Sequence, residues 1–132
     1  MVSASASETE PSPLSQEMDI LLVEDEVLNR WLFAEELRAA GFRVIEAGSA
    51  DEAWAYLMTG GKADLVFSDI VMPGDMDGRE LCKRLNDKFP AIKIVLTSGN
   101  SGPMSDVKYE RFLQKPYHFD HAIWIIRKAL RT

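Results

Sequence analysis

The amino-acid sequence predicts an α/β protein built on a doubly wound parallel sheet. Short apolar runs rich in Val, Ile and Leu alternate along the chain with stretches whose apolar residues recur at a helical period. Parallel strands joined by crossover helices place helices on both faces of one sheet. The run at 65–69 is largely apolar, ends on the carboxylate of Asp69 and is followed at once by Met72-Pro73-Gly74. We therefore expect a buried strand that delivers Asp69 to the edge of the sheet.

The remaining strand and helix candidates follow in the order that such a sheet requires. Each early helical stretch carries its own end signal, because Gly41 follows the first, Gly60 and Gly61 follow the second, and Pro90 closes the third. The expected strands are 20–23, 44–45, 65–69, 92–96 and 111–114. The expected helices are 28–40, a second that begins with the capping-box spacing of 49–52, a third that carries Leu81, Leu85 and Phe89, and a last with an inner face of Phe119, Ala122, Ile123, Ile126 and Leu130.

Composition and charge narrow the class of protein. The chain has 132 residues, enough for one domain, and its net charge of -6 opposes binding to nucleic acid or to an anionic membrane surface. The single Cys82 excludes an internal disulfide framework, so a reducing, cytoplasmic setting is expected. No stretch approaches the roughly 18 apolar residues that cross a bilayer. We expect residues 1–17, rich in Ser, Ala, Glu, Thr and Pro, to be a disordered tail and residues 18–132 to be the folded domain.

Polar side chains gather at the ends of the expected strands. They are Glu24 and Asp25 after the first strand, Asp69 at the end of the third, Thr97 and Ser98 after the fourth, and Lys115 after the fifth. The carboxyl ends of parallel strands share one edge, and ligands of open α/β sheets bind at that edge. We therefore expect these groups to converge in one site.

This combination predicts a site that accepts a phosphoryl group. Three neighbouring carboxylates repel one another, so they persist as anions only where a cation compensates. Oxygen ligands suit a hard divalent ion, and Mg²⁺ is typically held by carboxylates, waters and a phosphate oxygen. An aspartate can itself accept a phosphoryl group as an acyl phosphate, while a lysine and a hydroxyl bind the phosphoryl oxygens. Mg²⁺ is therefore the expected cofactor.

Four ordered motifs carry a resemblance to a known family. They are Val23-Glu24-Asp25-Glu26, Ser68-Asp69-Ile70-Val71-Met72-Pro73, Leu96-Thr97-Ser98-Gly99 and Gln114-Lys115-Pro116-Tyr117. Together they make residues 18–132 similar to the receiver domain of two-component response regulators. The resemblance implies a flavodoxin-like (βα)₅ fold with strand order 2-1-3-4-5, and phosphoryl transfer from a sensor histidine kinase. It also implies a signalling domain that accepts phosphate, loses it slowly by itself and acts on a downstream protein, rather than an enzyme.

The same resemblance implies which residues hold the phosphate and the metal. Asp69 would be the phosphoacceptor. Glu24, Asp25 and Asp69 would hold Mg²⁺ together with the backbone carbonyl of Val71.

The resemblance also implies the residues that respond to phosphorylation. Ser98 fits the switch hydroxyl, which contacts the phosphate, better than Thr97 does. Lys115 would be the phosphate-contacting lysine, and its peptide bond to Pro116 is expected to be cis. Phe112, three residues before the lysine, falls on the position of the switch aromatic residue.

The stretch between Ser98 and Lys115 departs from the family pattern. It is several residues short and contains Gly99, Gly102 and Pro103. We expect the fourth helix of the fold to be shortened or missing, with a loop in its place. Because that helix normally helps to form the output face, the usual dimer and signalling geometry is not expected to carry over unchanged.

Three apolar residues suggest a surface for a partner. Trp31 lies beside the inward face of the first helix, while Trp124 and Ile125 fall opposite the inner stripe of the last helix. In a receiver fold these two helices are neighbours, so exposed aromatic residues there would mark a kinase-docking or homodimer surface. Partial burial at the seam between the helices is the alternative interpretation.

Other functions remain open at this point. The chain is either a stand-alone regulator or a receiver domain detached from a hybrid kinase or phosphorelay protein. A small phosphatase of the haloacid dehalogenase type also uses an aspartate nucleophile, Mg²⁺ and a lysine, but it needs a second acid where this chain has Val71. A nucleotide-binding module is disfavoured because no glycine-rich phosphate loop follows the first strand. A binding module without phosphoryl chemistry is disfavoured by Asp69, Asp25 and Lys115.

Overall fold

The computed structural model describes residues 17–100, 102 and 104–131, and these residues form five strands and four helices. In chain order they are β1 (Asp19–Val23), α2 (Val27–Ala39), β2 (Arg43–Ala47), α3 (Ala50–Met58), β3 (Leu65–Asp69), α4 (Gly78–Lys88), β4 (Lys93–Ser98), β5 (Arg111–Gln114) and α5 (Phe119–Leu130). Every predicted element is present, although β2 is longer than predicted. The tail predicted for 1–17 lies outside the described residues except for Glu17, so it stays a prediction.

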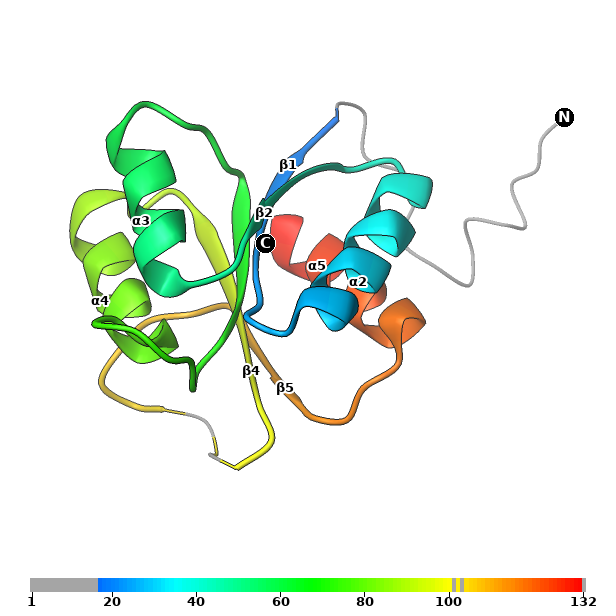
Figure 1. Cartoon of the computed structure of the whole chain (residues 1–132). Helices are drawn as coiled ribbons and strands as arrows, with labels where there is room; N and C mark the ends of the chain where they lie inside the picture. The colour runs from blue at the N-terminus through cyan, green and yellow to red at the C-terminus, as the bar shows by residue number, and fades with distance from the viewer. Residues whose placement is uncertain (1–16, 101, 103, 132) are drawn as a thin grey trace, which may run out of the picture.

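The five strands form one parallel sheet in the order β2-β1-β3-β4-β5, which confirms the predicted flavodoxin-like order. Helices α2 and α5 cover one face of the sheet, and α3 and α4 cover the other (Figure 1). The chain passes from β1 to β2 on one side and then to β3 on the other side of β1. The ends of β1 and β3 therefore flank the switch point at which such folds bind ligands.

Apolar side chains of the strands alternate between two cores. Leu21 and Val66 lie in the core beneath α3 and α4, whereas Leu22 and Phe67 lie in the core beneath α2 and α5. Because both faces of the sheet are covered, the strands appear in the sequence as nearly continuous apolar runs. Strand β3 is buried along its whole length, so Asp69 at its end is fixed by the core behind it.

Side-chain caps set the start of three helices. Ser49 caps α3 and Asp77 caps α4. At α2 the cap is Glu26, whose Oε1 accepts a hydrogen bond from the backbone N–H of Asn29 at 2.7 Å. Caps of this kind satisfy backbone groups that the first helical turn leaves without an intrahelical partner. The cap at Glu26 holds the first turn of α2 close to the end of β1.

Between β4 and β5 the described residues form a loop instead of a helix, as the shortness of this stretch predicts. The loop is anchored on α4, because Asn86 Nδ2 donates to the Lys108 carbonyl at 2.9 Å and the Lys108 N–H donates to Asn86 Oδ1 at 2.7 Å. Arg79 forms an ion pair with Asp106, and Val107 is buried in the core beneath α3 and α4. A loop held against α4 therefore takes the place of the surface that a helix between β4 and β5 would form.

The prediction that Ile125 is exposed is wrong. Ile125 is 8% exposed and packs in the core beneath α2 and α5. It lies three residues after Ala122 and four before Ala129, so it shares a helical face with these buried residues. The buried stripe of α5 is therefore wider than predicted. The neighbouring Trp124 does reach solvent, with 38% of its surface exposed.

Candidate functional site

The predicted acidic residues meet at the carboxyl edge of the sheet. Glu24 follows β1 directly and Asp69 is the last residue of β3. Carboxylate oxygens of Glu24, Asp25 and Asp69 all lie within 4.8 Å of one another. Glu24 is 5% exposed and Asp69 is 6% exposed, whereas Asp25 is open to solvent. The cluster thus has two buried acids and one accessible acid.

Lys115 joins this cluster from the end of β5. Its Nζ donates a hydrogen bond to Asp69 Oδ2 at 2.6 Å and lies 3.7 Å from Glu24 Oε1. The Lys115 backbone N–H donates to the Ser98 carbonyl at 2.9 Å, which extends the pairing of β4 and β5. The Lys115–Pro116 peptide bond is cis. Four strand ends therefore contribute to one site.

The carboxylate of Glu24 is held on both oxygens. Its Oε2 accepts from the backbone N–H of Glu26 at 3.0 Å, and its Oε1 accepts from Asn29 Nδ2 at 3.1 Å. Arg30 Nη1 donates to the Glu24 carbonyl at 2.9 Å, so a side chain from the first turns of α2 also holds the backbone of Glu24 in place. Glu24 is oriented by α2 as well as by β1.

Burial controls the electrostatics of the site. Burial raises the pKa of Asp69 above its ordinary value, although the hydrogen bond and charge of Lys115 lower it in part. Burial also raises the pKa of Glu24, against the hydrogen bond from Glu26 and the charge of Lys115. For Lys115 burial lowers the pKa, but the contact with Asp69 and the neighbouring acids outweigh it and the net shift is upward. Lys115 is therefore cationic at neutral pH.

The donor set fits a hard divalent cation. Three carboxylates face one ammonium group, so the excess negative charge favours a further cation. Oxygen ligands at this spacing are those that a small divalent ion takes. Val71, the predicted carbonyl ligand, lies on the turn that leaves β3 two residues after Asp69, with its side chain exposed.

The two hydroxyl candidates at the end of β4 differ in their surroundings. Ser98 is buried, and its Oγ accepts from the Asn100 N–H at 3.2 Å. Thr97 pairs with Asp69 in the β3–β4 register, and its Oγ1 is buried without a hydrogen-bond partner. Phe112 is half-buried against the core beneath α3 and α4.

A cavity of about 450 Å³ opens beside the ion pair. Its lining residues are Asn29, Gly99, Lys115, Pro116 and Tyr117. The Tyr117 ring packs against Phe33 and Phe67, with centroid distances of 6.1 Å and 5.8 Å. Burial raises the pKa of the Tyr117 hydroxyl, and the negative charges of Glu24 and Asp69 raise it further. Tyr117 therefore lies between the aromatic core and the acids.

The sequence-based prediction did not include Asn29 or Tyr117 among the site residues. Tyr117 adjoins Lys115-Pro116 in its motif, and Asn29 is a polar residue on the first turn after the acidic pair. Closeness in the sequence to a motif was the available signal for both.

Most of the chain matches one protein family. A family model described as the response regulator receiver domain matches residues 20–127. The chain belongs to this family. Phosphorylation by a kinase is the general role of receiver domains in two-component signalling. The phosphatase alternative finds no support in this match.

Curated relatives of this receiver domain include short and long proteins. The response regulator receiver protein CpdR of Brucella abortus (strain 2308) is 33% identical over 116 residues, which cover 84% of this chain and 95% of CpdR. The sensor kinase CckA of the same organism is 35% identical over 124 residues, 89% of this chain. The chain spans 13% of CckA and 24% of the regulator NtrC of Azospirillum brasilense, which it also matches.

Solved structures show the same fold. The receiver domain of NtrX from Brucella abortus superposes with a TM-score of 0.74 at 31% identity, covering 86% of this chain and 99% of that one. A CheY-like receiver domain from Methanospirillum hungatei JF-1 superposes with a TM-score of 0.81 at 22% identity, covering 88% and 95%. Within the described part of this receiver domain, every helix is too short or too polar to cross a membrane.

Proposed function

We propose that this receiver domain accepts a phosphoryl group from a sensor histidine kinase on Asp69. The proposed Mg²⁺ ligands are Glu24, Asp25, Asp69 and the Val71 backbone carbonyl. The geometry around Asp69 carries the proposal, because its buried carboxylate lies within 4.8 Å of two further acids and accepts a 2.6 Å hydrogen bond from Lys115. A carboxylate nucleophile with an ammonium group in contact and room for a divalent cation suits phosphoryl transfer.

The transfer step uses groups of this chain in distinct roles. A carboxylate oxygen of Asp69 forms a bond to phosphorus while the P–N bond of the donor phosphohistidine breaks, and the electron pair stays on the imidazole nitrogen. Mg²⁺, when bound, offsets negative charge on the transferring group. Lys115 provides a second positive charge, and Ser98 offers its hydroxyl to a phosphoryl oxygen. Val71 offers no acid or base for hydrolysis, which supports slow self-dephosphorylation.

The proposed response passes through β4 and β5. The acyl phosphate brings up to about two negative charges, to which Ser98 and Lys115 move. Phe112 is the proposed switch aromatic residue, and it pairs with Leu96 two residues before Ser98 in the β4–β5 register. Its inward turn would alter the loop that α4 anchors, and a downstream protein would detect this surface.

Replacing Asp69 with Asn tests the chemistry. Asp69→Asn should abolish acid-labile phosphate incorporation from acetyl phosphate, because an amide cannot form the acyl phosphate. Radiolabel or intact-mass measurement with and without Mg²⁺ gives the readout, and circular dichroism confirms the fold. Labelling that survives in Asp69→Asn would refute the assignment.

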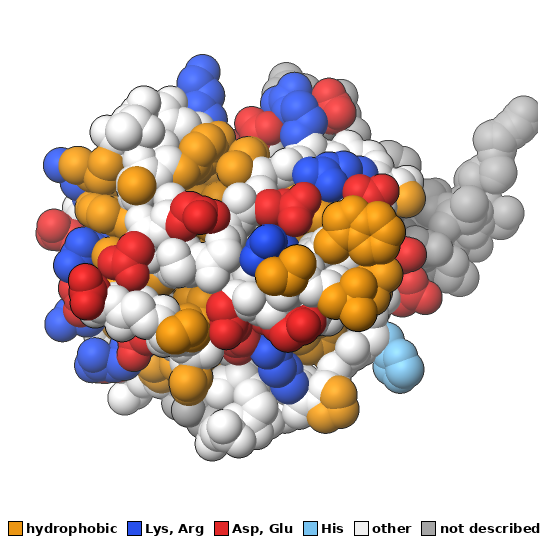
Figure 2. Space-filling view, viewed as in Figure 1, with side chains coloured by type: hydrophobic (Ala, Val, Ile, Leu, Met, Phe, Trp, Pro, Cys, Tyr) orange, Lys and Arg blue, Asp and Glu red, His pale blue; other side chains and the backbone are white. Residues whose placement is uncertain are grey.

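Hydrophobic side chains of the first two turns of α2 form an exposed surface, which we call the α2 patch (Figure 2). Its residues are Val27, Leu28, Trp31 and Leu32. Trp31 is 52% exposed, and the patch begins two residues after Asp25, so it borders the acidic cluster. A kinase that brings a phosphohistidine to Asp69 would cover this patch, and we propose the α2 patch as the kinase-docking surface.

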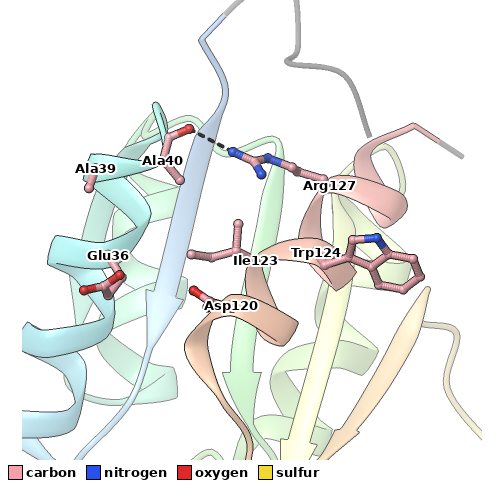
Figure 3. A pocket seen from close by; sticks show the side chains of 7 residues that line it. All are labelled: Glu36, Ala39, Ala40, Asp120, Ile123, Trp124 and Arg127. Carbon is pink, nitrogen blue, oxygen red and sulfur yellow. Dashed lines mark hydrogen bonds between the residues drawn. The ribbon is translucent and has the colours of Figure 1, made fainter. Parts of the chain in front are cut away.

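Trp124 lies apart from the α2 patch. It lines a groove of about 460 Å³ between α2 and α5, and its ring points away from α2 (Figure 3). His121 stacks on the ring and Lys128 lies over it, with Nζ 5.4 Å from the centroid. Because Ile125 is buried, the surface proposed on α5 reduces to Trp124. A homodimer through α2 and α5 is the alternative use of these helices.

Substituting Trp31 and Trp124 separately distinguishes a kinase-docking surface from a homodimer interface. Trp31→Ala should slow transfer from a histidine kinase that phosphorylates the parent chain, by roughly tenfold, because a central aromatic contact is lost. Trp124→Ala should leave that rate unchanged, and neither variant should change labelling by acetyl phosphate. An equal rate of transfer from the kinase to Trp31→Ala and to the parent would refute the α2 patch as the kinase-docking surface. A fall in solution mass in either variant would favour the homodimer.

A second candidate role is that of a receiver within a longer phosphorelay protein. The match to a segment of the sensor kinase CckA at 35% identity favours it, while the match over 95% of CpdR favours a single-domain regulator. Rapid transfer of label from phosphorylated Asp69 to a histidine phosphotransfer protein would support the phosphorelay. Retention of the label would support the single-domain regulator.

A further inference from the structure

We propose that Asn29 is a positioning residue for the cation site, which holds the Glu24 carboxylate in the orientation that Mg²⁺ requires. The inference rests on the proposed function, because it takes Glu24 as part of that site. Asn29 itself is not a metal ligand in this proposal. It acts through Glu24.

The contacts of Glu24 support this role. Asn29 Nδ2 donates to Oε1 at 3.1 Å, while the Glu26 N–H donates to Oε2 at 3.0 Å. Lys115 Nζ is 3.7 Å from the same Oε1, which is beyond hydrogen-bonding distance. Asn29 therefore supplies the side-chain hydrogen bond that keeps Oε1 directed along α2. Without it, Glu24 would be free to turn towards the ammonium group of Lys115.

The start of α2 fixes the position of Asn29. Its backbone N–H donates to the capping Glu26 at 2.7 Å, so its position follows the start of α2. Its side chain lines the same cavity as Tyr117, whose ring is packed against Phe33 and Phe67. Asn29 thus connects Glu24 to the start of α2. Groups that hydrogen-bond to metal ligands, and are themselves held in place, orient those ligands.

The loss of Asn29 should weaken cation binding without disrupting the fold. Asn29→Ala should raise the Mg²⁺ dissociation constant roughly tenfold, in the range typical for the loss of a hydrogen bond to a metal ligand. Alanine is a better helix former than asparagine, so α2 should still form. Asn86→Ala is the matched control, because the Asn86 side chain also makes hydrogen bonds from a helix, in its case from α4 to Lys108 on the opposite side of the sheet from α2. It should lower thermal stability but leave Mg²⁺ affinity unchanged.

Isothermal calorimetry with Mg²⁺ on the full chain measures the affinity. A second readout is labelling by acetyl phosphate at increasing Mg²⁺, where Asn29→Ala should raise the Mg²⁺ concentration for half-maximal rate and leave the saturating rate unchanged. The positioning role would be overturned if the Mg²⁺ dissociation constant of Asn29→Ala lay within twofold of that of Asn86→Ala. It would also be overturned if Asn29→Ala lowered the saturating rate by a factor comparable to its effect on the half-maximal Mg²⁺ concentration. If the parent chain bound no Mg²⁺, the proposed function would fail together with this inference. Parent binding with an unaffected Asn29→Ala would overturn this inference alone.

Discussion

Asp69 and Glu24 are buried acids at the carboxyl edge of the sheet. Burial raises the pKa of both carboxyl groups, so their ionised forms are less favourable in the folded protein than in the unfolded chain. Lys115 offsets part of this cost through its contact with Asp69. Buried charged groups that a protein retains for ligand binding commonly lower its stability.

The cost of burying the ionised Asp69, which Lys115 offsets only in part, predicts the stability of the Asp69→Asn variant without Mg²⁺. The folded state of the parent binds a proton at Asp69 more readily than the unfolded state does. Its free energy of unfolding should therefore rise as the pH falls from neutral through the folded pKa, and level off below the ordinary value of 3.8. Asparagine does not titrate, so Asp69→Asn should be more stable than the parent at pH 7, and the gap should narrow at lower pH.

Urea denaturation in EDTA between pH 4 and pH 7.5 measures this gap. The exposed Asp87 on α4 provides the control for the loss of one carboxylate, and Asp87→Asn should change the free energy of unfolding at pH 7 by less than Asp69→Asn does. A less stable Asp69→Asn at pH 7 would mean that the ion pair with Lys115 outweighs the cost of burial.

At the scale of elements, the junction between β3 and α4 fixes the end of the strand that carries Asp69. The Gly78 N–H donates to the Ile70 carbonyl at 2.8 Å, and a Cβ on Gly78 would collide with the Asp69 carbonyl oxygen. The turn in between contains Gly74 at a φ of 113°, close to Asp51 Oδ2 on α3. The first residue of α4 therefore packs directly against the backbone of Asp69.

The Gly78 contact predicts a coupled loss of stability and reactivity. Gly78→Ala should lower the free energy of unfolding by about 1 to 3 kcal/mol, because the added methyl group overpacks this junction. It should also slow labelling of Asp69 by acetyl phosphate. Gly102→Ala is the control, since a Cβ there meets no atom within 4 Å. Urea denaturation and labelling rates that match between the two variants would contradict the prediction.

At the scale of the whole molecule, two cores hold the strand ends that form the site. One core lies beneath α2 and α5 and the other beneath α3 and α4, and side chains from both pack on β1 and β3. The acids and the lysine come from residues as far apart in the sequence as Glu24 and Lys115. A ligand that joins these ends should therefore stabilise the entire fold.

Mg²⁺ should raise the thermal unfolding midpoint of the parent protein. A cation that binds the folded site and not the unfolded chain stabilises the fold by about 1.4 kcal/mol at ten times its dissociation constant. Asp25→Asn removes the accessible acid of the cluster and should lose most of this shift. Thermal scans in MgCl₂ and in NaCl of equal ionic strength measure the effect, and an equal shift in both salts would point to screening instead of binding.

The sequence by itself determined the fold class, the strand order through the family resemblance, and the acids and lysine at the strand ends. These features are local or depend on spacing: apolar runs closed by Pro and Gly mark strands, and parallel strands bring their ends to one edge. The loop between β4 and β5 was also predictable, because too few residues remain between Ser98 and Lys115 for a full helix and its connections.

Only the tertiary structure decided which side chains are covered and which contacts complete the site. Ile125 is buried because the face of α5 that packs in the core with α2 is wider than the inner stripe predicted from the sequence. The hydrogen bond from Asn29 to Glu24 depends on where the first turn of α2 lies relative to the end of β1, and the contacts of Lys115 with Asp69 and Glu24 depend on how the ends of β1, β3 and β5 meet. The geometry of these contacts is set by the packing of whole elements rather than by local pattern.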